Sequence, residues 1–147
     1  MEHKYNLNDV ALMTGLTTRT LRNYLTQGFL NGKKIDGTWL FTEEDLDHFF
    51  NDHFVKEGLR IKRTSVVFDF LAQKDMNGPR SCIILDIPGT RKKCDKISAF
   101  FCKQMNEAID VRFNYGYDKG FCRIILSGNA TSVTNIINAY NAMNFND

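Results

Sequence analysis

The chain has 147 residues, 19 of them lysine or arginine and 17 aspartate or glutamate, and 43% of its residues are apolar. This length suits one or two small domains, and a net charge of +2 excludes a polycationic tail. No run approaches the roughly 18 apolar residues of a membrane span, and the N-terminus lacks the apolar run of a signal peptide. We therefore expect a cytoplasmic protein without membrane contact.

Residues 7–13 and 18–26 are predicted to form two short helices joined by a tight turn. Asn6 is a candidate N-cap with Asp9 three residues on, as in a capping box. Gly15 supplies the positive φ that the turn needs. One side of the second helix is apolar. The opposite side carries Thr18, Arg19, Arg22, Asn23 and Thr26. Their guanidinium, amide and hydroxyl groups suit base edges and phosphates in a major groove.

Residues 29–41 follow the pattern of a β-hairpin. The first strand is expected to begin at Phe29-Leu30, and the second covers 38–41. Asn31-Gly32 and Asp36-Gly37 are the two candidate turns. Two lysines flank this hairpin and are expected to contact DNA phosphates: Lys33 and Lys34.

A series of motifs covers about the first third of the chain. They are Tyr5-x-Leu7-x-Asp9-Val10-Ala11-x-x-Thr14-Gly15-Leu16-Thr17, Arg19-Thr20-Leu21-Arg22-x-Tyr24, Gly28-Phe29-Leu30 and Gly37-x-Trp39-x-Phe41-Thr42-x-x-Asp45-Leu46. In this order and spacing they resemble the winged helix-turn-helix head of the MerR superfamily, and the last is closer to its excisionase-type branch. The resemblance implies sequence-specific DNA binding, with recognition helix 18–26 in the major groove and wing 31–39 on the backbone.

Two positions depart from the MerR pattern. Asn23 stands where many MerR heads carry a phosphate-binding tyrosine, and Trp39 replaces the Tyr-Arg pair of the wing. The DNA-distorting activation mechanism of MerR proteins is therefore not carried over. Trp39 is expected to pin the wing onto the helices, with a direct DNA contact as the alternative.

Charge is unevenly divided along the chain. Residues 1–58 hold six lysines and arginines against nine acids, a net charge of −3, and residues 59–147 carry +5. Counterion release drives much of DNA affinity, so we expect one head to bind DNA only modestly and with strong salt dependence.

A third helix is predicted from the capping box at Thr42 to a terminator at Gly58. Its apolar stripe comprises Leu46, Phe49, Phe50, His53 and Phe54. The stripe packs in the core of the chain or, alternatively, forms a dimer or interdomain contact. Residues 59–79 are expected to be a linker or connecting helix. Residues 64–73 are predicted to be helical, with a strand as the alternative. The basic cluster at 60–63 is a solvated face or a contact to the DNA backbone.

The sequence predicts two domains, a DNA-binding domain over 1–58 and a small α+β domain over 80–147. Residues 81–87 form a continuous apolar run, typical of a strand covered on both faces. The rest predicts a helix over 91–107, an alternating strand over 109–117, a partner strand over 121–126 and a final helix reaching Met143. The order β-α-β-β-α suggests an antiparallel or mixed sheet with helices on one side.

Catalytic chemistry and metal binding are not predicted. All three histidines lie before residue 54, no phosphate-binding Gly-x-x-x-x-Gly-Lys motif is present, and no Cys-x-x-Cys pair occurs. The cysteines are expected to be reduced core thiols: Cys82, Cys94, Cys102 and Cys122. Residues 88–93 could bind an anion at a helix start, or form an ordinary strand-to-helix turn.

The sequence thus predicts a non-enzymatic transcriptional regulator without metal or cofactor. Its expected partners are double-stranded DNA, a second copy in a homodimer, and a small-molecule or protein effector. Candidate dimer surfaces are the third predicted helix, with its three phenylalanines, and the hairpin around Arg112, Asn114 and Tyr115. A candidate effector wall comprises Phe100, Tyr115, Tyr117 and Arg123. The alternative is an interaction adaptor, or an excisionase-type DNA-architecture protein, whose head binds DNA weakly.

Overall fold

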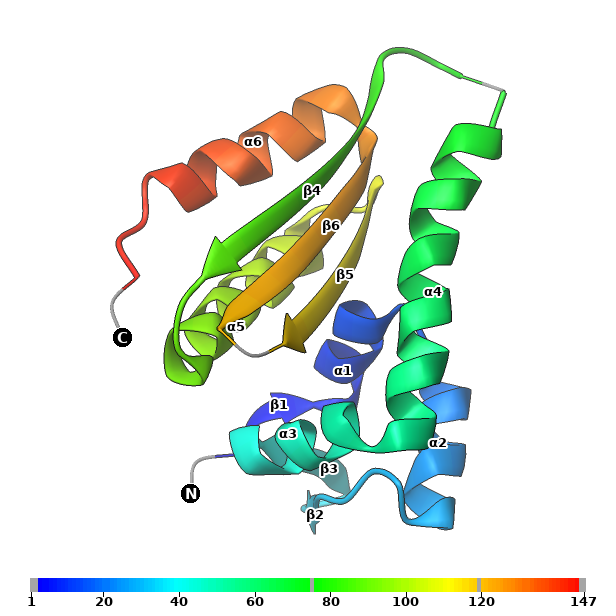
Figure 1. Cartoon of the computed structure of the whole chain (residues 1–147), viewed down its shortest axis with the longest axis vertical. Coiled ribbons are helices and arrows are strands. Elements are labelled where there is room, and N and C mark those ends of the chain that lie inside the picture. Colours follow the sequence, from blue (N-terminus) through cyan, green and yellow to red (C-terminus); the bar gives the residue numbers. More distant parts are fainter. Residues whose placement is uncertain (1–2, 75, 119, 146–147) are drawn as a thin grey trace.

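The computed structural model describes residues 3–74, 76–118 and 120–145 and shows an α+β chain, as the sequence predicts. In chain order the elements are β1 (His3–Asn6), α1 (Leu7–Thr14), α2 (Thr18–Gln27), β2 (Lys33–Ile35), β3 (Thr38–Thr42), α3 (Glu43–Asn51), α4 (His53–Ala72), β4 (Arg80–Pro88), α5 (Arg91–Glu107), β5 (Val111–Asp118), β6 (Phe121–Asn129) and α6 (Ala130–Asn141). Figure 1 shows a small sheet with α1 to α3 at one end, a larger sheet at the other, and α4 alongside. None of the helices described is long and apolar enough to cross a membrane.

The N-terminal sheet has three antiparallel strands in the order β1-β3-β2. The hairpin turn is at Asp36-Gly37, where both residues have positive φ, as a two-residue type I′ turn requires. Phe29 and Leu30 lie in the turn after α2 instead of in a strand, so the expected strand start is wrong. Strand β1, which pairs Tyr5 with Phe41, was not predicted, because four residues carry too little periodicity to show a strand.

The predicted third helix is two helices with a break at Asp52. The Asp52 side chain accepts hydrogen bonds from the backbone N–H groups of Phe54 (3.0 Å) and Val55 (3.1 Å) and so starts α4. Gly58 lies inside α4 and ends no helix, so that expectation is wrong. The helix continues because doing so buries Leu59 and Val66, which outweighs the roughly 1 kcal/mol that a helical glycine costs.

The second sheet has the antiparallel order β4-β6-β5 and is covered on both faces. Helices α5 and α6 cover one face, and α1 and α4 lie against the other (Figure 1). The two helices of residues 80–147 thus lie on one side of the sheet, and the other face is covered by helices from the first half of the chain, which the sequence did not predict. The covering by α1 and α4 buries Asn114 and Gly116, although the alternating apolar pattern of the strand predicts exposed positions there. It stops short of β4, where Ile84 is 53% exposed, so the run at 81–87 is not covered on both faces.

The main core of the second half is aromatic. Phe101 of α5 stacks on Phe113 of β5 (centroids 5.9 Å apart) and on Tyr140 of α6 (5.6 Å). Such pairs add about 0.5–1.5 kcal/mol each beyond the burial of area. Two predicted apolar positions fail: Ile109 precedes β5 and is fully exposed, and Met143 follows α6 and is half-exposed. Each lies just past the end of its element, where the periodicity no longer fixes a direction.

The four cysteines are free thiols, and three of them are buried, as expected for core residues. Cys82 is half-buried on β4. Burial raises the pKa of the Cys82, Cys102 and Cys122 thiols, which keeps them protonated and poorly nucleophilic. Among the described residues no three histidine, cysteine or acidic side chains gather where they could hold a metal ion.

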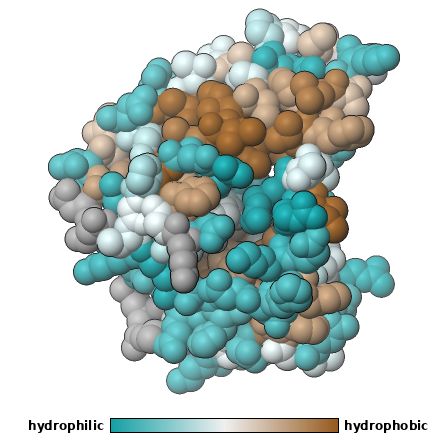
Figure 2. All heavy atoms as spheres, viewed as in Figure 1, coloured by the Kyte–Doolittle hydropathy of each residue, from teal (hydrophilic) through white to brown (hydrophobic). Residues whose placement is uncertain are grey.

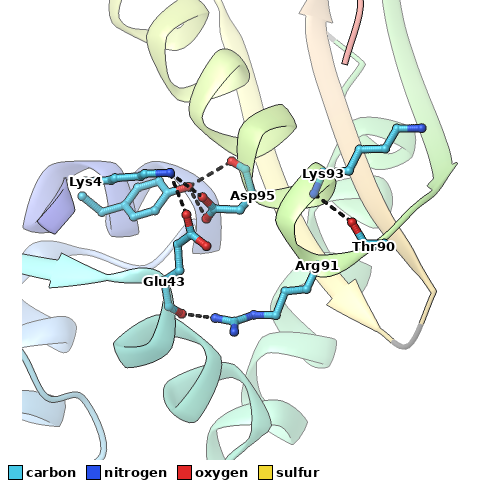
Figure 3. Close-up of polar contacts among 7 residues, drawn as sticks. Lys4, Glu43, Thr90, Arg91, Lys93 and Asp95 are labelled. Carbon is cyan, nitrogen blue, oxygen red and sulfur yellow. Dashed lines mark hydrogen bonds and ion pairs between the residues drawn. The ribbon is translucent and has the colours of Figure 1, made fainter. Parts of the chain in front are cut away.

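A polar cluster joins β1 and α3 to α5 (Figure 3). The Tyr5 hydroxyl donates to Asp95 Oδ1 (2.5 Å), and Lys4 lies 2.7 Å from the Glu43 carboxylate. Burial, then the hydrogen bond to Glu43, raises the pKa of Asp95 to about 7, and the hydrogen bond from Asp95 lowers the pKa of Glu43. Below about pH 7 the Asp95 carboxyl is therefore protonated and can share its proton with the Glu43 carboxylate.

Candidate nucleic-acid interface

Helices α1 and α2 are joined by a turn that their own side chains define. Asn6 and Asp9 form the predicted capping box at the start of α1. Gly15 closes α1 with a φ of 72°, and Thr17 caps α2 by accepting a hydrogen bond from the Thr20 backbone N–H (3.1 Å). At the end of α1 the Thr14 hydroxyl donates to Val10 O (2.8 Å) and accepts from the Leu16 backbone N–H in the turn (3.2 Å). These hydrogen bonds join residues within four positions of each other, so local interactions define the turn between the helices.

Helix α2 presents the predicted polar face to solvent. Arg19, Arg22 and Asn23 are exposed and Thr18 is half-buried, while Leu21 on the opposite side is completely buried. The four polar side chains lie within about one and a half turns of helix, so they form one continuous surface. This surface is rigidly presented, because the buried side of α2 is anchored in the core.

Lys33 and Lys34 are both exposed on β2 but leave the strand on opposite sides. Lys34 pairs with Trp39 on β3, and its ammonium lies 6.0 Å from the centre of the indole ring. Trp39 is half-buried against the core of the head, which agrees with a role in fixing the hairpin. Helix α2 and the hairpin lie at the same end of the molecule (Figure 1).

Five of the acids of the head cap helices or form ion pairs. The acids Asp9, Asp45 and Asp52 accept hydrogen bonds at helix starts, and Glu43 and Asp47 pair with Lys4 and Arg91. By contrast, within the described residues no ion pair neutralises the four cations of α2 and β2, which are Arg19, Arg22, Lys33 and Lys34. A nearby phosphate would therefore meet cations that need not break an existing ion pair.

The helix-turn-helix is fastened to the second sheet at its turn. The buried Asn114 amide of β5 donates to Thr14 O (2.9 Å), at the last residue of α1. A Cβ placed on Gly15 would lie 3.4 Å from the Lys62 side chain of α4, so the turn packs against that helix as well. No local sequence pattern predicts this contact, because Asn114 follows Thr14 by 100 residues.

Several other predicted sites are not formed. Asn114 and Tyr115 are buried, so the proposed dimer surface on that hairpin is wrong. The expected effector wall is split. Phe100 packs with Tyr140 and Phe145, and Tyr115 is buried, so only Tyr117 and Arg123 line the same recess.

The turn before α5 has the features of an ordinary strand-to-helix connection. Thr90 caps the helix by accepting from the Lys93 backbone N–H (3.2 Å; Figure 3). Arg91 donates to the Glu43 carbonyl and pairs with Asp47 (3.1 Å). Its guanidinium is thus committed to α3 and does not serve an anion at the helix start.

Comparison with known proteins agrees with this geometry. A family model described as a helix-turn-helix domain matches residues 5–53, which span β1 to the start of α4. The head is therefore a helix-turn-helix domain of a DNA-binding class. Neither the curated proteins nor the solved structures contain a match to the chain.

Proposed function

We propose that this protein is a sequence-specific transcriptional regulator whose head binds double-stranded DNA through α2. The observation that carries the proposal is the exposed arc of Arg19, Arg22 and Asn23 on the second helix of a helix-turn-helix domain. In such domains the second helix enters the major groove. The MerR and excisionase-like resemblance of residues 5–50 supports the same reading, which is one of binding and not of catalysis.

The side chains divide into base readers and backbone contacts. Arg19 or Arg22 has the reach and the planar fork to bind guanine O6 and N7 together, and Asn23 suits adenine N6 and N7. Thr18, at the N-terminus of α2, supplies a hydroxyl for a phosphate or a base. Lys33 and Lys34 on the hairpin are point charges that suit phosphates. Because their side chains leave β2 on opposite sides, only one of them would contact a given DNA duplex.

A single head covers few base pairs, so useful specificity needs two heads. We place the homodimer contact on the outer side of α4. Its large apolar residues Phe54, Ile61 and Phe68 recur every seven positions and are 64%, 59% and 69% exposed. Three small residues also recur every seven positions along this seam: Gly58, Ser65 and Ala72. A seven-residue repeat of this kind is the pattern of a helix-to-helix seam.

The large and small positions complement each other in an antiparallel pair. When two copies of α4 cross antiparallel at residue 63, Phe54 faces Ala72 of the second copy and Ile61 faces its Ser65. Phe68 then faces Gly58, which has no side chain. Each large side chain therefore meets a gap, as an interface with two-fold symmetry requires. The seam contains no charged residue, although the helix carries six lysine, arginine and acidic side chains.

DNA binding is tested by retention of the full-length protein on random duplexes across a salt series, beside Arg22→Glu. We expect retention that weakens steeply with salt, because each phosphate contact contributes about −0.9 to the logarithmic slope. Arg22→Glu should abolish it. Lys92→Glu, the same charge change on exposed α5, is the matched control and should bind like the parent. Binding that survives Arg22→Glu would move the contact away from α2.

The dimer is tested separately by sedimentation equilibrium. Ile61→Glu should give a monomer, because it places a charge in the centre of the seam. Ile109→Glu makes the same change at a fully exposed isoleucine outside α4 and should leave the dimer intact. A parent protein that sediments as a monomer, or a dimer that persists in Ile61→Glu, would contradict the α4 contact.

The net charge of −3 on residues 1–58 favours a second candidate, an interaction adaptor or an excisionase-type architectural protein with weak DNA affinity. The same salt series separates the two functions. Absence of retention even at low salt would support the adaptor, in which the exposed face of α2 contacts a protein.

A further inference from the structure

A groove of about 830 Å³ lies between α4 and the face of the second sheet that α4 leaves partly open. It belongs to neither the DNA-facing surface of α2 nor the seam proposed for the dimer. Its walls combine basic and apolar side chains from both elements, among them Lys56, Arg63 and Val67 of α4 and Ile84, Arg123 and Ile125 of the sheet.

One end of the groove is basic, with Arg63 at its centre. The Arg63 guanidinium packs on the backbone of Gly116, where a Cβ would lie only 2.6 Å from Nη1. A residue with a side chain at position 116 would therefore expel it. Among the described residues neither Arg63 nor Lys56 has an ion-pair partner.

The other charges around Arg63 do not supply a full counter-charge. Arg60 is paired with Glu57 at 2.6 Å, and Arg123 is paired with Asp86 at 2.7 Å. Burial, then the nearby Arg123, lowers the pKa of Arg63, and Asp118 offsets this only in part. The basic end thus has a positive potential with a half-buried guanidinium at its centre.

The other end is apolar. Ile84 of β4 is 53% exposed, and Val67 of α4 and Ile125 of β6 complete this wall. Figure 2 shows this as a continuous brown surface over β4, β6 and the C-terminal half of α4, beside the hydrophilic residues near the middle of α4. An exposed apolar surface that borders a positively charged recess is the form of a small-molecule site, because such sites combine a mostly apolar lining with a few charged or polar groups.

We propose that this groove binds a small organic anion with an apolar body. The carboxylate or phosphate of the ligand would contact Arg63 and Lys56, and its apolar part would cover Ile84. The volume lies within the roughly 300–1,000 Å³ typical of small-molecule sites. A narrower recess of about 80 Å³ continues beside Gly116 and is walled by Phe50, Tyr117 and Phe121. The inference depends on the groove alone and not on DNA binding.

The test is calorimetric titration of the full chain with decanoate, decyl phosphate and decanol in the absence of DNA. We expect at least one of the two anions to bind at least tenfold more tightly than decanol, because all three share an apolar chain and only the anions carry charge. Decanoate against decyl phosphate then identifies the preferred head group. Arg63→Gln should remove the preference for the anion, and Ile84→Asp should weaken binding of all three.

Arg112→Gln is the matched control, because Arg112 lies outside the groove, exposed on β5 beside Asp69. If Arg63→Gln does not fold, as judged by thermal unfolding, the exposed Lys56→Gln tests the same charge and should lower anion affinity severalfold. Equal binding of decanol and both anions would overturn the proposal. So would a preference that survives both substitutions, or a change of the sedimenting species in Ile84→Asp, which would show a second copy in the groove.

A DNA duplex provides the last arm of the experiment. If a duplex displaces decanoate equally from the parent and from Arg22→Glu, the groove binds phosphodiesters and the small-molecule proposal is wrong. Loss of DNA binding in Arg22→Glu with unchanged anion titration would leave the groove proposal standing. The two proposals can therefore fail independently.

Discussion

Substituting Asp95 by asparagine should remove most of the pH dependence of stability between about pH 4.5 and 7. In the native chain burial raises the pKa of this carboxyl from 3.8 to about 7. The native carboxyl thus keeps its proton over a range in which the unfolded one has lost it. Because the folded state then binds more protons, stability falls as the pH rises from about 4 to 7.

The magnitude follows from the size of the shift. At 1.36 kcal/mol per pKa unit the full displacement corresponds to about 4 kcal/mol, and the side chain is only 13% exposed, so little of this is screened by solvent. The lowered pKa of Glu43 acts in the opposite direction but below about pH 4.5, where that carboxylate loses stabilisation on protonation. We therefore expect a fall of roughly 2–4 kcal/mol between pH 4.5 and 8 in the parent protein.

Urea unfolding at a series of pH values measures this effect. Asp95→Asn preserves the shape, can accept the hydrogen bond from Tyr5 and can donate to Glu43, so it should be nearly flat over the same interval. Asp69→Asn removes an exposed carboxylate and is the control that should keep the parent slope. An Asp95→Asn variant with the slope of the parent would refute the assignment of the buried proton to Asp95.

Three further substitutions test the packing. Asn114→Ala should cost about 1–3 kcal/mol in urea unfolding, because the buried Thr14 carbonyl loses its donor; no loss would mean that water replaces the amide. Phe101→Ala should cost about 3–5 kcal/mol at the centre of the aromatic core, whereas the exposed Phe68→Ala, measured under dimer-free dilution, should cost less than about 1 kcal/mol. Thr42→Ala should cost about 1 kcal/mol through loss of the capping box of α3, seen as a lower thermal midpoint.

Part of the fold follows from the sequence alone, and those parts are local. The capping boxes at Asn6 and Thr42, and the left-handed Gly15, were predicted because donor and acceptor lie within four residues. The bounds of α5 were predicted because its apolar residues recur at helical spacing over 17 residues. The polar face of α2 follows from the same periodicity.

Features that depend on residues far apart in the sequence were determined by the tertiary structure. Gly58 reads locally as a helix end, yet burial of Leu59 and Val66 carries α4 through it. Asn114 reads as a solvent-facing position of an alternating strand, yet α1, 100 residues earlier, covers it and accepts its hydrogen bond.

The groove is the clearest case of a site that only the fold creates. Arg63 and Gly116 are 53 positions apart and carry no mutual signal in one sequence, and the space for the guanidinium exists only because β5 passes beneath α4. The sequence by itself determined the local elements and the candidate DNA-facing residues, because both depend on periodicity within a few turns. The faces that became buried, and the groove that stayed open, were decided by long-range packing.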